Sequence, residues 1–293
     1  MIDIKEIKSI RIVPYTLMNS SIAALMGLIY AIILIIVLGI VGLPIAGISS
    51  GTMATLAIAL IFILPAGTFL LSIVRSFLTA FLYNALVPKL GGIKLGLEDL
   101  KEVKSVPVVP FALMISSFSA IIVFIAMLVI GPIIVFLLQG VALTGRIPGL
   151  SSIGAWGILG LLVLVIGVPI MMFVASFIMT ALAAIFYNLL APKIGGIEFE
   201  FEALKEKVYA INAISPIKLA LITSIVMTIV LFISEFLSVI GNILRGYSIT
   251  TEIIGLLIRV VFDLVVLFIV YAIMAVLYNF LAPKIGTVKI EME

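Results

Sequence analysis

The chain consists of long apolar runs separated by short stretches in which apolar and polar residues alternate. Apolar runs that approach or exceed ~20 residues have the length of a bilayer-spanning helix. They predict helices at about 14–38, 53–87, 110–138, 153–191, 216–240 and 252–282. Gly-rich or polar linkers at about 39–52, 139–152 and 241–251 divide these helices into three pairs.

The alternating stretches have the period of a strand with one buried face. They follow each helix pair at Ile93–Glu98, Ile197–Glu202 and Val288–Glu293. Shorter stretches ending in proline precede each pair at Ile10–Pro14, Val106–Pro110 and Ile211–Pro216. We therefore expect two strands per pair on one side of the membrane. If the first strand pairs with the last, these strands close into a ring without free edges.

Each helix pair ends in the same phrase, Tyr-Asn-x-Leu-x-Pro-Lys-x-Gly, at 83–91, 187–195 and 278–286. Such a recurrence indicates one unit written three times. The predicted units are 1–98, 99–204 and 205–293. The predicted fold class is an integral membrane α-helical protein with six transmembrane helices as three pseudo-threefold repeats. Each repeat is a helical hairpin flanked by short strands, and these form a small cytoplasmic β platform.

Prolines and glycines refine this unit. Pro65 and Pro169 each lie 18 residues before the tyrosine of their unit, and we expect a kink or break in both second helices there. The pairs Gly91-Gly92 and Gly195-Gly196 supply the turn from helix to strand. The third unit has Gly286-Thr287, which predicts that only the first glycine is required.

Composition excludes an ordinary soluble domain. Hydrophobic residues make up 65% and charged residues 11%, against ~25% charged in soluble proteins, and the mean hydropathy is +1.47. The chain has no Cys and no His, which excludes thiolate and imidazole catalysis and most zinc sites. No P-loop or hydrolase phrase occurs. We predict no enzymatic activity, no cofactor and no metal site. Few Gln and Asn residues and many Ile suggest a heat-adapted source.

Basic residues are distributed unevenly. Thirteen of the 17 Lys and Arg lie in the strand-side segments, whereas the opposite loops hold only Arg146 and Arg245. The positive-inside rule then places both termini and the platform in the cytoplasm of a multi-pass protein of the cell (plasma) membrane. The lipid bilayer is the expected partner. A cytoplasmic or membrane protein partner and a homo-oligomer are compatible with the sequence, and the mixed charges predict no nucleic-acid binding.

The repeated phrase supplies the first candidate site residues. The amides of Asn84, Asn188 and Asn279 either line a pore around the repeat axis or hydrogen-bond between helices or to nearby backbone. Tyrosine is typical of the membrane interface, and lysine complements a helix C-terminus and meets lipid phosphates. We therefore expect a headgroup-contacting set, namely Tyr83, Lys89, Tyr187, Lys193, Tyr278 and Lys284.

Charges within apolar helices form a second candidate site, because they are costly in a bilayer. Counting along the helices places Glu235 and Arg259 at one depth, with Asp263 one turn below Arg259. Arg75 stands apart in the first unit. Either the cluster fastens the helices of the third unit as an ion pair, or it selects ions. It has no counterpart in the other units, which favours fastening.

The Tyr-Asn-x-Leu-Ala phrase, the Gly-Gly turn and the alternating strand resemble a two-helix bacterial transmembrane domain family of unknown function. The resemblance covers nearly the whole chain, as three fused copies. It implies a membrane protein without assigned activity, so it carries over no catalytic residue. It also implies that single-copy relatives assemble as oligomers and that this chain has fused the trimer.

Three functions follow from these observations. The leading one is a pseudo-trimeric channel or small-solute conduit along the repeat axis. The alternative is a membrane scaffold or accessory subunit whose β platform docks a partner protein. A membrane enzyme acting on lipid is disfavoured by the missing His, Cys and enclosed acid pairs. Polar residues facing the axis in all three units would favour the conduit, and an axis filled by large apolar residues would favour the scaffold.

Overall fold

The computed structural model describes residues 2–42, 47, 49–143 and 157–293. Arg146, predicted to lie in a loop, falls outside these residues. The chain forms two compact units: residues 1–106 with 186–293, and residues 107–185. All six strands belong to the first of these compact units. The repeat boundaries 1–98, 99–204 and 205–293 stay a prediction.

Among the described residues, six helical segments are long and apolar enough to cross a membrane. They are α1 (Ile12–Gly42), α2 (Ser50–Leu90), α3 (Val108–Leu143), the continuous run α5 (Gly157–Leu162), η1 (Val163–Gly167) and α6 (Val168–Ile194), α7 (Pro216–Leu244) and α8 (Ile249–Ile285). The prediction of six apolar helices is confirmed, and the chain is a multi-pass membrane protein by this criterion. With 41 residues, α2 is ~60 Å long, about twice the hydrocarbon thickness.

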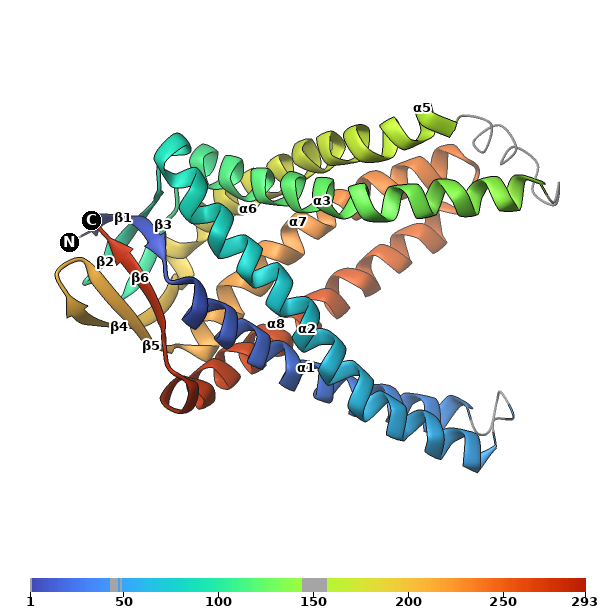
Figure 1. Ribbon diagram of the computed structural model, residues 1–293, viewed down its shortest axis with the longest axis horizontal. Helices are drawn as coiled ribbons and strands as arrows, with labels where there is room; N and C mark the ends of the chain where they lie inside the picture. The colour runs from blue at the N-terminus through green and yellow to red at the C-terminus, as the bar shows by residue number, and fades with distance from the viewer. Residues whose placement is uncertain (1, 43–46, 48, 144–156) are drawn as a thin grey trace. The chain divides into compact units, whose positions relative to one another are not determined.

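The strands form one antiparallel closed barrel in the order β1-β2-β3-β4-β5-β6. They are β1 (Ile2–Ile10), β2 (Ile93–Glu98), β3 (Glu102–Ser105), β4 (Ile197–Lys205), β5 (Val208–Ile214) and β6 (Val288–Met292). β1 and β6 lie side by side (Figure 1), with Ile10 opposite Ile290. The expected pairing of first and last strands is therefore present, and the sheet has no free edge.

The barrel interior is a packed apolar core. Leu97 and Met292 are 0% and 1% exposed, and Ile93, Val103 and Ile290 are also buried. Opposed residues such as Ile7 and Ile93 share a face, which fixes this inward set by register. A barrel of eight strands has just enough interior for side chains. This six-stranded barrel is narrower, and its buried side chains fill it.

Two of the three opening strands, those that precede a helix pair, lie earlier than predicted. The stretches Ile10–Pro14 and Val106–Pro110 were expected to be strands, but β1 ends at Ile10 and β3 ends at Ser105. Ile12 and Val108 already begin helices. The prolines lie in the first helical turn, where the missing N–H is no loss. Ile211–Pro216 agrees better, since β5 ends at Ile214 and Pro216 begins α7.

The two prolines in the second helices behave differently. Of the kink or break expected at Pro65, the break is absent, because α2 runs through this proline as one helix. There α1 approaches closely: a Cβ on Gly27 would lie 2.3 Å from the Thr68 hydroxyl oxygen and 2.9 Å from the Leu64 carbonyl oxygen. At Pro169 the helix widens into the π-helix η1, closed by a bond from the Val168 N–H to the Val163 carbonyl. The proline ring crowds the carbonyl four residues earlier, which explains a wider turn at this point.

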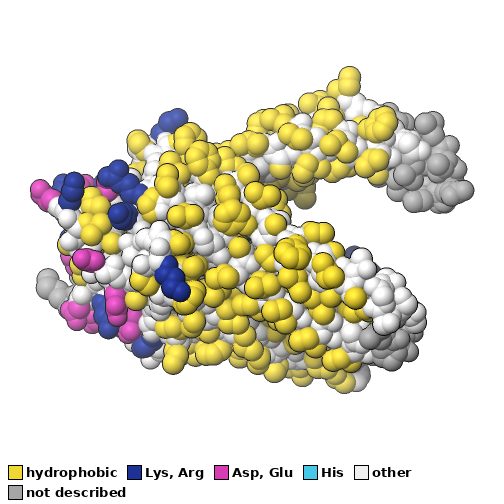
Figure 2. All heavy atoms as spheres, turned by 60° about the horizontal axis from the view of Figure 1, so that its bottom comes forward, with side chains coloured by type: hydrophobic (Ala, Val, Ile, Leu, Met, Phe, Trp, Pro, Cys, Tyr) yellow, Lys and Arg dark blue, Asp and Glu magenta, His cyan; other side chains and the backbone are white. Residues whose placement is uncertain are grey.

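The molecular surface separates polar from apolar regions. Figure 2 shows most of the visible Lys, Arg, Asp and Glu side chains gathered around the barrel, while hydrophobic side chains cover most of the visible surface of the helices. Such an apolar helix surface suits contact with lipid rather than water.

Candidate functional site at the junction of barrel and helices

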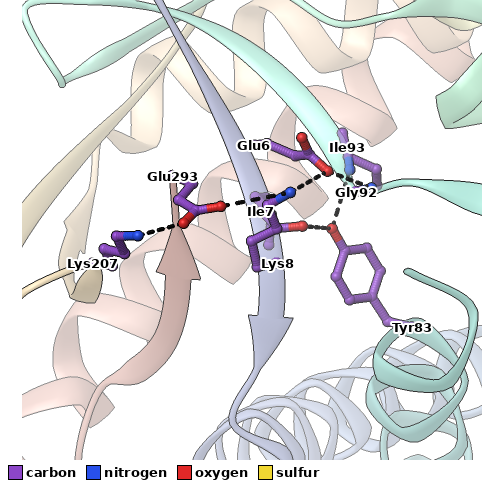
Figure 3. Close-up of polar contacts among 8 residues, drawn as sticks. All are labelled: Glu6, Ile7, Lys8, Tyr83, Gly92, Ile93, Lys207 and Glu293. Carbon is purple, nitrogen blue, oxygen red and sulfur yellow. Dashed lines mark hydrogen bonds and ion pairs between the residues drawn. The ribbon is translucent and has the colours of Figure 1, made fainter. Parts of the chain in front are cut away.

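Each repeated tyrosine ties a helix end to two strands. We call β1, β3 and β5 the opening strands and β2, β4 and β6 the closing strands. The Tyr83 hydroxyl donates to the Ile7 carbonyl at 2.6 Å and accepts from the Ile93 N–H at 3.2 Å (Figure 3). The other two copies repeat these bonds: Tyr187 with Val103 (2.6 Å) and Ile197 (3.0 Å), and Tyr278 with Ile211 (2.5 Å) and Val288 (3.3 Å).

Each repeated asparagine binds the end of the opening strand through both polar atoms of its amide. Asn84 accepts from the Ile10 N–H and donates to the Ile10 carbonyl, both at 2.8 Å. The same two bonds join Asn188 to Val106 (2.8 and 2.8 Å) and Asn279 to Ile214 (2.9 and 2.8 Å). This is the backbone-bonding alternative for the three asparagines. We refer to each Tyr and Asn pair with its backbone bonds as a clamp.

The tyrosines differ from the expected headgroup-contacting set. Tyr83 is only 2% exposed, and Tyr187 and Tyr278 are also buried. Their hydroxyls bind strand backbone inside the junction. The lysines remain exposed at the helix ends: Lys89, Lys193 and Lys284. The Lys284 ammonium lies 3.3 Å from the centre of the Phe280 ring, a cation–π contact.

The glycines at the turn serve two purposes. Gly91, Gly195 and Gly286 have φ of 82°, 91° and 94°, a backbone region that favours glycine. The second glycine is required for space, contrary to the sequence prediction: a Cβ on Gly92 would lie 2.2 Å from the Ile7 carbonyl oxygen. On Gly196 it would lie 1.9 Å from that of Val103.

Two glutamates complete the junction in the first two copies. The Glu6 carboxylate accepts from the Gly92 N–H at 2.8 Å, and the Glu102 carboxylate accepts from the Gly196 N–H. Each carboxylate also pairs with a lysine two residues on: Glu6 with Lys8 (3.0 Å), and Glu102 with Lys104 (2.9 Å). In the third copy Ala210 and Asn212 replace this pair, and Thr287 replaces the second glycine.

These glutamates were missed at the level of sequence, although a signal exists. Glu6-Ile7-Lys8 and Glu102-Val103-Lys104 share one spacing, and both occur only in units with two glycines at the turn. The acid, the lysine and the second glycine are present or absent together. That joint occurrence indicates mutual contact.

A second set of bonds runs around the outside of the barrel. Each opening strand pairs a polar side chain with a glutamate at the end of the closing strand of a different predicted repeat. The pairs are Lys8 with Glu293 (3.7 Å), Lys104 with Glu98 (3.1 Å) and Asn212 with Glu202 (2.9 Å). The three contacts use equivalent positions of the strands. The contact that joins the beginning of the chain to its end, Lys8 with Glu293, therefore has the same pattern as the other two.

The junction carboxylates give stability a dependence on pH. Hydrogen bonds from Lys8 and from the Gly92 N–H lower the pKa of Glu6 below its usual 4.5. Burial raises the pKa of Glu102, but the bonds from the Gly196 N–H and Lys104 outweigh it, and that pKa is also lowered. A carboxylate with a lowered folded-state pKa stabilises the fold above its unfolded-state pKa and loses this contribution as pH falls through the folded value.

We therefore expect the midpoint of thermal unfolding to fall as pH drops below 4.5. Glu6→Gln with Glu102→Gln should flatten this dependence, because the amide oxygen still accepts from glycine but does not titrate. Glu200→Gln, on an exposed strand position, is the matched control and should leave the slope unchanged. An identical slope in the double variant and the native protein would contradict the role of these two side chains.

The charges within the helices are partly paired. The Arg259 Nε donates to a Glu235 carboxylate oxygen at 3.1 Å, joining α8 to α7. Among the described residues, Asp263 and Arg75 have no ion-pair partner within 4 Å, and Arg75 is exposed on α2. The geometry corresponds to the fastening alternative for Glu235 and Arg259.

Arg259→Leu should lower the free energy of unfolding by about 1–3 kcal/mol, because the Glu235 carboxylate loses its partner. Adding Glu235→Gln should recover part of that loss. A double-mutant cycle on unfolding in detergent measures the coupling. Solute flux in liposomes should be the same for all four proteins. Zero coupling, or flux altered by the single variants, would argue against fastening.

No family model, curated protein or solved structure matches this chain. The resemblance to the two-helix domain family therefore stays a prediction that rests on the repeated phrase.

The junction holds structure together rather than presenting reactive groups. The repeated hydroxyls and amides are engaged by backbone, and the carboxylates by backbone and lysine. Within the described residues, no group of three Asp or Glu side chains is placed to hold a metal ion. What the arrangement can do is fix the end of each second helix to two strands of the barrel.

Proposed function

We propose that this chain is a membrane scaffold, a fused pseudo-trimer whose helical hairpins anchor a closed barrel that docks a partner protein. The carrying observation is the barrel itself. Its interior is filled by buried side chains such as Leu97 and Met292. A solute that follows the barrel axis would have to displace this core, which close packing opposes. This favours the scaffold over a conduit through the barrel.

The clamps support the same proposal. Three tyrosines and three asparagines each make two bonds to strand backbone. A buried polar group that loses its partner costs about 1–3 kcal/mol, so these bonds resist separation of helix ends from barrel. Rigid attachment suits a platform that presents one surface. It does not suit an element that must move to open a path.

The outer face of β1 offers the docking surface. Ile2 and Ile4 are 56% and 66% exposed, although most of the barrel surface around them is polar. By register Ile4 lies opposite Gly96, which has no side chain to cover it. Exposed aliphatic side chains beside charged residues are typical of a protein contact.

Co-purification from the native membrane tests this proposal. In mild detergent after cross-linking, a protein should accompany the native chain but be lost from the double variant Ile2→Ser and Ile4→Ser. Leu204→Ser, which alters an exposed leucine elsewhere on the barrel, is the matched control and should retain it. Ion and solute flux in liposomes should equal that of empty liposomes. Retention of the partner by the double variant would overturn the proposed surface.

A conduit remains the second candidate on one observation. The hydroxyls of Ser20 and Thr228 are buried within the helices without a hydrogen-bond partner among the described residues. Such groups are often satisfied by internal water. Ser116 and Ser224, at positions matching Ser20, are buried as well. Flux above background that is abolished by Ser20→Leu would favour a hydrated path entering beside the barrel.

The proposed orientation places the barrel and both termini on the cytoplasmic side of the plasma membrane. It rests on the concentration of basic residues near the strands. A cysteine replacing Tyr247, exposed between α7 and α8, should react with an impermeant thiol reagent added outside intact cells. A cysteine replacing Glu200 on β4 should react only after permeabilisation. The chain has no native Cys to interfere, and reversed labelling would refute the orientation.

A further inference from the structure

The π-helix of the second compact unit borders an apolar pocket of about 360 Å³ between α3 and the run η1–α6. Ile121 and Phe124 line it from α3, and Ile166, Pro169 and Phe173 line it from the opposite side. The volume falls within the ~300–1,000 Å³ typical of ligand sites.

Two close contacts between the same helices bracket the pocket along the chain. Gly131 of α3 faces η1 and the residues before it: a Cβ there would lie 3.4 Å from Leu161 Cδ1 and Val165 Cγ2. Toward the other end, the hydroxyls of Ser119 and Ser176 lie 3.2 Å apart. The pocket residues on α3 fall between Ser119 and Gly131. The helices therefore meet on both sides of the pocket and leave a gap within it.

The local backbone explains the gap. Pro169 cannot donate to the preceding turn and crowds its carbonyl, and the helix responds with the wider π turn that contains Ile166. The lining thus depends on a proline and a helix irregularity, and π turns often occur at functional sites.

We infer that this pocket binds one hydrocarbon chain of a membrane lipid. The apolar side chains of its lining exclude a headgroup, and an apolar chain needs no polar partner. Phe124, Ile166 and Ile170 are exposed on the helix surface, in segments apolar enough to lie in a bilayer. Bilayer lipid is therefore the solvent at the mouth of the pocket, and a chain enters sideways from it.

Photo-cross-linking tests this inference independently of the scaffold proposal. The full chain is placed in phosphatidylcholine nanodiscs that contain a phospholipid with a diazirine midway along one acyl chain. After illumination, mass spectrometry maps the labelled residues. Labelling at Phe124, Ile166 and Ile170 should exceed that at Val129, exposed on α3 outside the pocket, severalfold. Equal labelling of these positions would overturn the inference.

A variant whose side chain fills the pocket provides a second test. Ala120 lines the pocket, whereas Ala126 on the same helix does not. Ala120→Phe should remove the excess labelling at Ile166 and Ile170, and Ala126→Phe should leave it in place. Far-UV circular dichroism establishes that each variant is folded. Excess labelling that persists in a folded Ala120→Phe protein, or labelling by a headgroup-borne diazirine at the same residues, would also overturn it.

Discussion

Gly196→Ala should strongly destabilise the protein. The added Cβ would lie 1.9 Å from the Val103 carbonyl oxygen and 2.8 Å from the Tyr187 hydroxyl. These two atoms share a hydrogen bond of the clamp, so the methyl group must push the strand away from the helix end. Overpacking typically costs about 1–3 kcal/mol, and the loss of clamp bonds adds to that cost. We expect a large drop in the midpoint of thermal unfolding in detergent.

Gly39→Ala is the matched control, because nothing lies within 4 Å of the position that its added methyl group would take on α1. Alanine is a better helix former than glycine by about 1 kcal/mol, so this variant should be unchanged or slightly stabilised. Thr287→Gly in the third copy should also be tolerated. A Gly196→Ala protein as stable as Gly39→Ala would mean that β3 does not pass this close to the turn.

Asn188→Leu should have the second largest effect. Leucine has a similar shape but leaves the N–H and the carbonyl of Val106 without the partners that Asn188 provides. Each unsatisfied buried group costs about 1–3 kcal/mol. The midpoint of thermal unfolding should therefore fall, and proteolysis near residue 106 should become faster as the strand end frays.

Asn212→Leu controls for the loss of an amide as such. Asn212 is exposed on β5 and bonds only a glutamate side chain, so its replacement should change stability little. Asn84→Leu and Asn279→Leu should reproduce the effect of Asn188→Leu if the three clamps are equivalent. Three clearly unequal losses would show that one clamp carries the junction.

The helices and the closing strands could be predicted because each leaves a local pattern. Apolar runs predicted all six spans, and strict alternation located β2, β4 and β6. The opening strands were harder to predict from the sequence. β1 mixes Lys5, Glu6 and Lys8 with its isoleucines, and these polar side chains form ion pairs along the strand.

The role of the repeated tyrosines could not be read from their surroundings in sequence. Tyrosine is enriched at the membrane interface, next to the ends of membrane helices. This enrichment does not indicate that a strand will pack against the helix end and bind the tyrosine hydroxyl. The bond from Tyr83 reaches Ile7, which is 76 residues away. The pairing of β1 with β2, in which Ile7 lies opposite Ile93, brings that carbonyl to the helix end.

The two prolines show a second limit of prediction from local sequence. Pro65 and Pro169 have the same spacing to their tyrosines, yet one helix stays α-helical and the other becomes a π-helix. Beside Pro65, Gly27 lets a neighbouring helix approach closely, and the Thr68 hydroxyl donates to the Leu64 carbonyl. The outcome depends on neighbours that the proline alone does not specify.

The pairing of β1 with β6 means that the barrel cannot close until the end of the chain has been synthesised. Arg11 and Glu291, which bond across this seam, are 280 positions apart. At ~5–20 residues per second, a ribosome needs roughly 15 to 55 s between them. Throughout that interval one side of β1 lacks its partner, while the helices between are already entering the bilayer. A nascent chain paused before β6 should therefore be sensitive to protease at β1, and it should become resistant once the last strand emerges.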